Sequence, residues 1–414
     1  MPETTAAADE PGRSKRKRRN APKLRDGVMR RGNTWSYVIR VKDAETGVSK
    51  PRWVGGFATE EAAKAARDEA RIKARQGQYI DHNSITVATY LDEWIEAHAV
   101  QVKPKTLQDY RHLIDRHVRP RIGDLRLQAV RPATITKLYR DLATSGGRNG
   151  GGLSPRTVEY VHAVLRKAFR DAIVVDQLLP SNPVERAKRP RKTLSEPGQV
   201  WTPSQLRAFL DTASQHRLFA FYRLAAYTGA RRGELLNLRW RDIDLDLGEV
   251  RITGSAAVIA GQRVEGTTKS GRSRTVSIDA ETVQVLRDHR KRQAEERLKV
   301  GPEWRATDDY VFATAWGEPI HPDTVSSLMT VLISTHNDPQ DGDGPDDPLP
   351  HARLHDLRHV HATTLLLAGV PVHVVAARLG HADPSITLRV YAHVISDQLA
   401  EAADIFARAI ADTG

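Results

Sequence analysis

Four prolines punctuate residues 180–197 and set the strongest limit on how this chain can fold. Proline lacks a backbone N–H group and fixes its own φ angle, so no helix can continue through such a stretch. The residues between the prolines are polar and basic, which is typical of a linker. With 414 residues, the chain is long enough for about two or three domains. We therefore expect a linker at residues 181–199 with separate domains on its two sides.

Before the linker, the pattern changes from strand-like to helical near residue 85. Asn33–Val41 and Arg52–Phe57 are rich in aromatic and β-branched residues, as strands are. Thr59–Gln76 is rich in Ala, Glu, Lys and Arg, as helices are. We expect residues 26–83 to form a small three-stranded sheet with a helix behind it. The surface of such a sheet could contact DNA, but any small domain would have a similar surface.

Residues 86–180 repeat their apolar side chains at helical spacing. The repeat runs from Val87 to Ile95 and again from Val158 to Ala172. Ser154 can cap the second of these helices, and Pro155 suits its first turn. A compact helical domain is the expectation for this range.

After the linker, residues 200–414 mix helical and strand patterns. Thr202–Gln205 is a capping box that starts a helix. Val250–Ile252 and Thr275–Ile278 are predicted strands, and the acidic segment Asn337–Pro350 is expected to be a surface insertion. The predicted fold class is a multidomain protein that is mainly α with small β-sheets, and its last domain is α+β.

The chain is strongly basic, with 63 Lys and Arg against 51 Asp and Glu and a net charge of +12. Such a charge favours a polyanionic partner, and charge alone does not separate nucleic acid from an anionic membrane. Residues 1–85 carry 19 basic and 11 acidic side chains. We expect residues 1–25 to be a disordered basic arm, for which phosphate contact and simple solvation are both open. The candidate DNA-contact residues are Arg16, Lys17, Arg18, Arg19, Lys103 and Lys105.

Cysteine usage and hydropathy limit the location of the protein. The chain has no cysteine, which excludes disulfides and thiolate metal sites and favours an intracellular protein. No apolar run approaches the ~18 residues of a membrane span, and no apolar signal core follows the basic N-terminus. We expect a soluble, cytoplasmic protein without a membrane partner.

Two short segments after the linker place basic side chains where a phosphate can bind. In Thr228–Trp240, Gly229 interrupts one helix and the next starts around Arg231. The backbone N–H groups and the guanidinium at such a helix start can point at one anion. In Glu249–Ile278, Lys269 is predicted to lie near a hairpin tip, from which it can swing toward a reacting group. Each signal alone also fits an ordinary exposed side chain.

Two further segments carry histidines and a tyrosine. His355 and Arg358 are three residues apart and hence on one helical face. His355 and His359 have a spacing that suits zinc, but the chain has neither cysteine nor a His-Glu-x-x-His pattern, so a phosphate site is favoured over a metal. Leu379–His381 closes a helix with glycine at its end, and Tyr391 follows ten residues after His381.

Together these four segments resemble the tyrosine recombinases, and within them the integrases of phages and integrative elements. They occur in the family's order over about 165 residues. The proposed layout of an N-terminal arm-binding module, a core-binding domain and a catalytic domain is also similar. The matches are Thr-Gly-x-Arg-x-x-Glu at Thr228–Glu234, His-x-x-Arg-His at His355–His359, Leu-Gly-His at Leu379–His381 and Tyr-x-His at Tyr391–His393.

The resemblance implies cleavage of DNA without a metal or other cofactor. Two guanidinium groups can bind the non-bridging oxygens of a five-coordinate phosphoryl group. The implied roles are phosphate binding by Arg231 and Arg358, nucleophilic attack by Tyr391, proton acceptance by His355, proton donation to the 5′ oxygen by Lys269, a phosphate hydrogen bond from His381 and support of the arginines by Glu234.

A 3′-phosphotyrosine keeps most of the energy of the broken bond, so a free 5′-hydroxyl can reseal the strand without ATP. The implied activity is therefore breakage and rejoining of double-stranded DNA at attachment sites, through a four-way junction in a homotetramer. A DNA-bending protein and an excision directionality factor are candidate further partners. Gln398–Ala411 has the apolar spacing of a helix that docks on a neighbouring subunit or on its own domain.

Three alternatives stay open at this point. A resolvase or a type IB topoisomerase uses the same tyrosine chemistry, and the N-terminal basic module favours an integrase over both. A catalytically inactive DNA-binding regulator on the same fold would have no need of a tyrosine beside two arginines. A metal-dependent nuclease would need a cluster of carboxylates that these motifs lack.

Overall fold

The computed structural model describes residues 26–42, 48–76, 79–81, 83–190, 200–269, 271–338 and 347–381, together with residues 383–385, 387, 388, 407 and 411. The basic arm, residues 191–199 of the linker and Tyr391 lie outside the described residues, as do nearly all of Gln398–Ala411 and the middle of the acidic insertion. The contacts between residues divide the chain into two compact units. One comprises the described residues up to 102 and from 109 to 190, and the other comprises 103–108 and the described residues from 200 onward.

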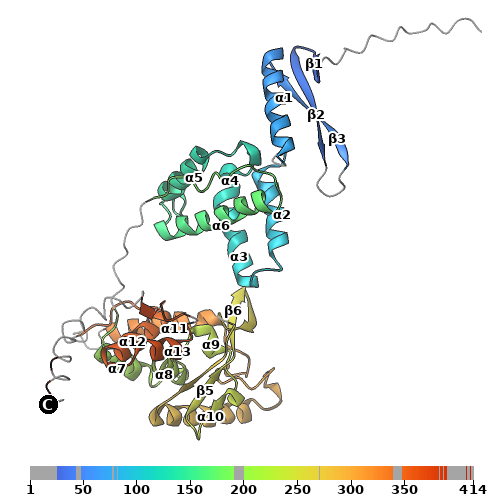
Figure 1. Ribbon diagram of the computed structural model, residues 1–414. Coiled ribbons are helices and arrows are strands. Elements are labelled where there is room, and N and C mark those ends of the chain that lie inside the picture. The colour runs from blue at the N-terminus through green and yellow to red at the C-terminus, as the bar shows by residue number, and fades with distance from the viewer. Residues whose placement is uncertain are drawn as a thin grey trace, which may run out of the picture. The chain divides into compact units, whose positions relative to one another are not determined.

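The N-terminal module is a three-stranded antiparallel sheet with a helix on one face (Figure 1). Tyr37 and Ile39 alternate with more exposed neighbours along the middle strand and face the helix, where Ala63 and Ala70 complete the core. Thr59 caps the helix by accepting a hydrogen bond from the Ala62 N–H at 3.1 Å. The predicted sheet and helix are therefore confirmed. The elements are β1 (Val28–Arg31), β2 (Thr34–Lys42), β3 (Ser49–Phe57) and α1 (Glu60–Arg75).

Residues 86–102 and 109–180 form a helical bundle. Residues 181–190, predicted to be linker, pack on it, since Asn182 donates to the Arg166 carbonyl at 3.0 Å and Val184 is fully buried. The first helix is tied to the last one through buried polar contacts, since Trp94 Nε1 donates to Asp171 at 2.7 Å and the Tyr90 hydroxyl donates to the Ala168 carbonyl at 2.9 Å. Ser154 caps the last helix and Pro155 occupies its first turn, as predicted. The elements are α2 (Val87–His98), α3 (Pro104–Leu113), η1 (Ile114–Val118), α4 (Arg119–Ile122), η2 (Leu127–Ala129), α5 (Pro132–Ser145) and α6 (Pro155–Val174).

The last unit begins with the predicted capping box. Thr202 accepts from the Gln205 N–H at 3.2 Å, and the Gln205 side chain accepts from the Thr202 N–H at 3.1 Å. Its elements are α7 (Pro203–Ala213), α8 (Phe219–Thr228), α9 (Arg232–Leu236), η3 (Trp240–Asp242), β4 (Ile243–Asp244), β5 (Glu249–Ile252), β6 (Gly254–Ile259), β7 (Gln262–Thr267), β8 (Arg274–Ser277), α10 (Ala280–Val300), η4 (Gly301–Glu303), α11 (Pro322–Asn337), α12 (Leu354–Leu367) and α13 (Val372–Leu379).

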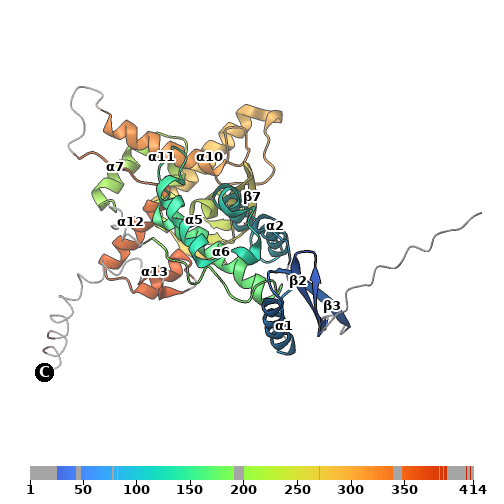
Figure 2. The ribbon, with the colours of Figure 1, turned by 90° about the horizontal axis from the view of Figure 1, so that it is seen from above.

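The apolar core of this unit is built around α8, whose Phe221, Tyr222 and Leu224 are fully buried. Helices α10 and α12 pack on α8, and α13 lies beside α12 (Figures 1 and 2). Burial on this scale supplies about 1.5–3 kcal/mol for each large apolar side chain. The helix core thus fixes the ends of α8 and α12, which carry two of the motif segments.

The strands of the last unit correct one sequence prediction. Strands β5 and β8 pair directly, with Val250 opposite Val276, as expected. The polar connection between them, however, contains its own hairpin of β6 and β7, whose two-residue turn is Ala260-Gly261. Both turn residues have positive φ, as a type I′ turn requires. Lys269 therefore lies in the turn that joins β7 to β8, and the prediction that it lies near a hairpin tip is wrong.

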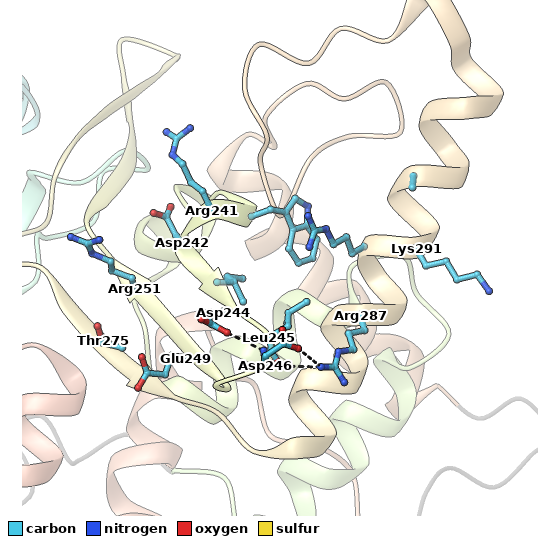
Figure 3. A pocket seen from close by; sticks show the side chains of 14 residues that line it. Arg241, Asp242, Asp244, Leu245, Asp246, Glu249, Arg251, Thr275, Arg287 and Lys291 are labelled. Carbon is cyan, nitrogen blue, oxygen red and sulfur yellow. Dashed lines mark hydrogen bonds and ion pairs between the residues drawn. The ribbon is translucent and has the colours of Figure 1, made fainter.

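A groove of about 800 Å³ lies between the β4-β5-β8 sheet and α10 (Figure 3). Both acidic and basic side chains line it, among them Asp244, Arg251 and Lys291. Thr275 lines the groove, and the side chain of its neighbour Arg274 is directed to the other face of β8 because side chains alternate along a strand. The other face of β8 adjoins the motif segments.

Within the described part of the chain, no helix has both the length and the apolar character needed to span a membrane.

Candidate active site

The turn between α8 and α9 brings Arg231 to the start of α9. Gly229 ends α8 with a φ of +60°, and a Cβ atom there would come within 2.7 Å of the Leu379 side chain. Only glycine satisfies both limits. The Arg231 backbone N–H and its Nη1 donate to the two oxygens of Glu234 at 2.9 and 2.8 Å. Arg231 is thereby fixed while its side chain remains 24% exposed.

Glu234 holds a second arginine, Arg274 of β8. Arg274 donates to the two Glu234 oxygens at 3.2 and 2.7 Å, and Glu234 is only 1% exposed. Burial raises the pKa of Glu234, but the hydrogen bonds and charge of Arg274, followed by those of Arg231, outweigh burial and hold that pKa below its ordinary value. One carboxylate between two guanidinium groups leaves one positive charge uncompensated, which favours an anion nearby.

Arg358 of α12 joins this turn to the residues after α13. Its Nη1 donates to the Gly229 carbonyl at 2.7 Å, and its Nη2 donates to His381 Nε2 at 2.8 Å. A guanidinium has no acceptor, so Nε2 of His381 is the acceptor and Nδ1 carries the proton, which points to the Thr387 hydroxyl at 2.7 Å. Arg358 is 3% exposed, and its orientation is fixed on both sides.

The histidines near these arginines are neutral at physiological pH. Burial lowers the pKa of His381 to about 4, and the charges of Arg358, Arg231 and Arg274 contribute to the same shift. Burial of the ring likewise lowers the pKa of His355 to about 4, and the charges of His359 and Arg358 add to this shift. The residue as a whole is nevertheless exposed. A neutral, accessible imidazole such as that of His355 can accept a proton.

His355 and His359 lie edge to face, with ring centroids 5.1 Å apart. Among the residues that the structure describes, these two rings do not join a group of three or more side chains suited to hold a metal ion.

Lys269 lies in an exposed turn that begins at the buried residue Thr268. Thr268 is buried, and its hydroxyl donates to the Arg272 carbonyl at 2.8 Å. The Gly271 N–H donates to the Thr268 carbonyl at 3.0 Å, and Gly271 has a φ of +72°. Lys269 thus extends from a short turn at the end of β7.

The sequence analysis gave no role to two residues of this region, Arg274 and Arg378. Arg274 was missed because its partner Glu234 is 40 residues away and no local spacing reveals the pair. Arg378 donates to His361 Nε2 at 3.0 Å and to the carbonyls of Tyr227 and Ser277 at 2.8 and 2.9 Å. This arginine connects α13 to the end of α8 and to β8.

The structure therefore brings Arg231, Glu234, Arg358 and His381 together, and His355 is close enough for the charges of Arg358 and Arg231 to lower its pKa. Lys269 lies at the end of β7. The candidate DNA-contact lysines 103 and 105 are exposed at the start of α3, and the arm residues 16–19 and Tyr391 lie outside the described residues. Two oriented guanidinium groups beside neutral histidines can bind an oxyanion such as a phosphodiester.

Three family models match the chain, one after the other. An arm DNA-binding domain matches residues 28–74, the N-terminal SAM-like domain of phage integrases matches residues 86–143, and the phage integrase family matches residues 199–397. The chain belongs to the phage integrase family of tyrosine recombinases. It is a site-specific DNA recombinase, and it carries the arginine cluster in the part matched by the phage integrase family.

The recombinase is similar in sequence to curated relatives over most of their length. It is 27% identical over 365 residues to a tyrosine recombinase XerC-like protein of Caldanaerobacter subterraneus subsp. tengcongensis, covering 84% of this chain and 89% of that protein. It is 28% identical over 350 residues to the ICEBs1 integrase of Bacillus subtilis, covering 84% of this chain and 88% of that protein.

Solved structures share the fold of the recombinase. The Tn1549 transposon integrase in complex with circular intermediate DNA has a TM-score of 0.61 at 19% identity, covering 74% of this chain and 95% of that one. A lambda integrase tetramer bound to a Holliday junction has a TM-score of 0.51 at 19% identity, covering 90% of this chain and 96% of that one. The predicted fold class is thereby confirmed.

Proposed function

We propose that this recombinase is an integrase that cuts and rejoins DNA through a 3′-phosphotyrosine at Tyr391 to integrate or excise a mobile element. The observation that supports it most is the fork of Arg358. One arm of that guanidinium binds the Gly229 carbonyl, two residues before Arg231, and the other binds His381. Three motif segments far apart in the sequence thus converge on one small volume, and Tyr391 follows the third of them closely in the chain.

The proposed chemistry begins with binding of the scissile phosphate by Arg231 and Arg358. Phosphoryl transfer passes through a five-coordinate state in which the non-bridging oxygens gain negative charge, and preorganised guanidinium groups stabilise that charge. His381 can add a hydrogen bond to the phosphate only by giving up one of its present partners, because its Nε2 accepts from Arg358 and its Nδ1–H faces Thr387. Glu234 orients Arg231 and touches no substrate, so it is a positioning residue.

Proton transfers balance the two bond changes. The Tyr391 oxygen forms a bond to phosphorus and gives its phenolic proton to His355, which is neutral at physiological pH because its pKa is about 4. The bond between phosphorus and the 5′ oxygen breaks, and that oxygen takes a proton from Lys269. In the rejoining step the protons return, and a free 5′-hydroxyl displaces Tyr391.

The proposed partner is double-stranded DNA that carries the attachment sites, bound by a homotetramer that exchanges strands through a four-way junction. We assign arm-type DNA binding to residues 26–83 with the basic arm 1–25, core-site binding to 86–180 and catalysis to 200–414, separated by the linker 181–199. A DNA-bending protein and a directionality factor are proposed as accessory partners. The uncompensated charge beside Glu234 and the net charge of +12 support a polyanionic partner.

A resolvase or type IB topoisomerase remains the second candidate because the same arginines and tyrosine serve its chemistry. Relaxation of supercoiled DNA without any specific sequence supports a topoisomerase. Recombination between two copies of one site, without arm-type sequences, supports a resolvase. The match of an arm DNA-binding domain to residues 28–74 favours the integrase.

The test is formation of a covalent adduct on a nicked DNA that carries the candidate attachment site, so that the cut releases a short fragment and traps the enzyme. Wild type should give a protein–DNA adduct on a denaturing gel, and Tyr391→Phe should give none while still binding the DNA. An adduct that survives Tyr391→Phe would show that the nucleophile lies elsewhere.

A further inference from the structure

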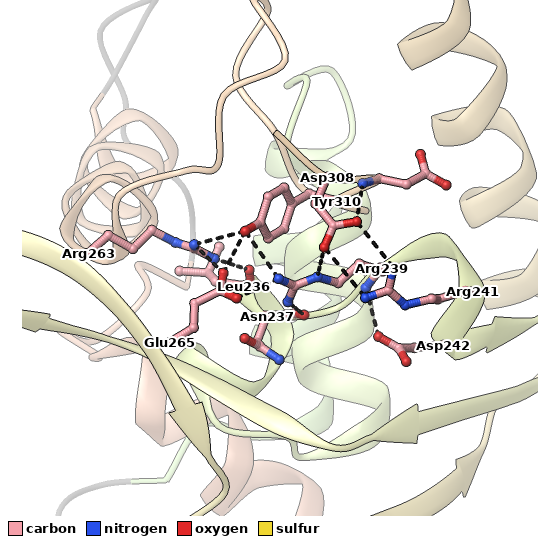
Figure 4. Close-up of polar contacts among 10 residues, drawn as sticks. Leu236, Asn237, Arg239, Arg241, Asp242, Arg263, Glu265, Asp308 and Tyr310 are labelled. Atoms are coloured by element: carbon pink, nitrogen blue, oxygen red, sulfur yellow. Dashed lines mark hydrogen bonds and ion pairs between the residues drawn. The ribbon is translucent and has the colours of Figure 1, made fainter. Parts of the chain in front are cut away.

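A network of charges lies on the hairpin side of the catalytic unit, apart from the residues given a role above (Figure 4). Arg239 and Tyr310 are buried, while the Glu265 side chain is 31% exposed. Its centre is Glu265 of β7. The Tyr310 hydroxyl donates to Glu265 at 2.7 Å, and Arg239 and Arg263 both donate to the same carboxylate. The Arg239 guanidinium also lies over the Tyr310 ring, 4.3 Å from its centroid.

The network joins three segments that are distant in the sequence. Arg239 follows α9, Glu265 belongs to β7, and Tyr310 lies in the segment after η4. Arg239 is held further by Asp308 at 2.9 Å, and Arg263 donates to the Leu236 carbonyl at 2.8 Å. Burial raises the pKa of Glu265, but the hydrogen bonds from Arg239, Tyr310 and Arg263 outweigh it and hold that pKa below its ordinary value. These paired charges therefore link Glu265 of β7 to Arg239 and Tyr310.

The hairpin that carries Glu265 is also pressed against α9. A Cβ atom on Gly233 would come within 2.2 Å of the Ala256 carbonyl of β6, and one on Gly254 would come within 2.4 Å of the Asn237 amide. Glycine at these two positions lets the backbone of β6 approach α9 closely. The close approach fixes one strand of the hairpin, and the Glu265 network fixes the other.

Lys269 extends from the end of the strand that the network fixes. Glu265 precedes Lys269 by four residues, about 13 Å along an extended strand. Between them, Thr268 is buried and begins the turn that exposes Lys269. The position of the hairpin relative to α9 therefore sets where the Lys269 ammonium can reach.

We propose that Glu265, Arg239 and Tyr310 form a positioning device for Lys269, which holds the β6–β7 hairpin so that the ammonium meets the departing 5′ oxygen. The proposal rests on the function given above, in which Lys269 is the acid of the cleavage step. In this proposal the three residues act through Lys269 and not on the DNA. Weakening the network displaces the proton donor and leaves the arginine cluster in place.

A substrate with sulfur in place of the bridging 5′ oxygen separates these two effects. A thiol has a pKa near ~8.5, far below that of an alcohol, so a thiolate leaves without a proton from Lys269. Loss of Lys269 should therefore slow cleavage of ordinary DNA and leave cleavage of the sulfur substrate nearly intact. Loss of Arg231 should slow both, because phosphate charge develops in either case.

The experiment measures single-turnover adduct formation by the full chain on both substrates. Tyr310→Phe removes only the hydroxyl that binds Glu265, and Glu265→Gln removes the charge. We expect both to cleave ordinary DNA more slowly, by about 10-fold to 100-fold as for a misplaced catalytic group. Both should cleave the sulfur substrate at a rate within about twofold of wild type, which is also the result expected for Lys269→Ala.

The matched control is Glu296→Gln on α10, since Glu296 forms a comparably buried pair with Arg217 at 2.6 Å but lies outside the hairpin. It should slow neither substrate. The proposal is overturned if Tyr310→Phe and Glu265→Gln slow cleavage of both substrates equally. It is also overturned if both variants cleave both substrates at the wild-type rate. If the sulfur substrate does not rescue Lys269→Ala, Lys269 is not the acid. If wild type forms no adduct, the proposed function is wrong. Either result also contradicts the positioning role.

Discussion

Arg358 connects three parts of the site because its guanidinium is planar and carries donors on two sides. One nitrogen reaches the Gly229 carbonyl, and another reaches His381 Nε2. A lysine in its place has one ammonium on a flexible chain and cannot span both acceptors. At this scale the sequence predicted the motif residues well, because each motif sets a residue type at a fixed local spacing. It could not predict Arg274, whose partner Glu234 belongs to another segment.

Arg358→Lys should therefore keep the positive charge and lose the simultaneous hydrogen bonds to the Gly229 carbonyl and His381. We expect the rate of adduct formation to fall by about 100-fold, as when a preorganised donor is lost, and the affinity for DNA to change little. Single-turnover adduct formation and a gel-shift assay measure the two quantities. Arg353→Lys, an exposed arginine just before the same helix, is the control and should match wild type. Equal losses in both variants would contradict the role of the fork.

The helices and their ends position these side chains, and glycine determines two of the ends. Gly229 and Gly380 both adopt positive φ, which ends α8 and α13 and turns the chain into the site. The sequence predicted such helix ends, and the caps at Ser154 and Thr202, because capping follows local residue types. It did not predict the β6–β7 hairpin, since its Ala260-Gly261 turn lacks the usual Asn-Gly signal.

Gly380→Ala should disturb the site beyond the strain of its backbone. Gly380 has a φ of +69°, and a Cβ atom there would come within 2.6 Å of the Arg274 guanidinium. Gly369 has a φ of +81° with open space around it, so Gly369→Ala carries the strain alone. We expect each variant to lose about 1–2 kcal/mol of unfolding free energy, and only Gly380→Ala to cleave about 10-fold more slowly. Urea unfolding and adduct formation measure these effects, and equal cleavage rates would count against the Arg274 contact.

Packing of α10 also predicts a pH dependence of stability. His289 is 2% exposed and donates from Nε2 to the Val311 carbonyl at 2.8 Å, and burial lowers its pKa to about 4. Below pH ~6.5 the unfolded chain takes up a proton at this residue that the folded chain refuses until about pH 4. Stability should therefore fall as the pH drops from 6.5 to 4, by up to about 3 kcal/mol from this residue.

Urea unfolding of wild type and His289→Gln at several pH values isolates this contribution. The variant should lose less stability than wild type over that range, because glutamine does not titrate. Parallel curves for the two proteins would show that His289 is protonated equally in both states.

At the scale of the whole molecule, the spacing of apolar residues and the position of the prolines predicted the order of the domains. The switch from strand-like to helical spacing and the prolines of the linker are visible in one sequence because they depend on local chemistry. The contacts that complete the site are different, since Glu234 with Arg274 and Glu265 with Tyr310 pair across 40 and 45 residues. Such pairs depend on tertiary packing, which local spacing does not encode.

The distribution of charge predicts how binding responds to salt. If Arg18 and Arg19 contact phosphates, Arg18→Ala/Arg19→Ala should make the slope of log affinity against log salt concentration shallower by about 2 on attachment-site DNA. Arg297→Ala/Lys299→Ala on α10 removes the same charge from exposed positions and should leave the slope unchanged. Equal slopes for all three proteins would leave the basic arm as a solvated tail.

The most direct test of the account is a structure of the full recombinase trapped on nicked attachment-site DNA. It should show the Tyr391 oxygen bonded to the 3′ phosphate, with guanidinium nitrogens of Arg231 and Arg358 within about 3.2 Å of its non-bridging oxygens. A phosphate bonded to another residue, or held away from both arginines in every subunit, would contradict it.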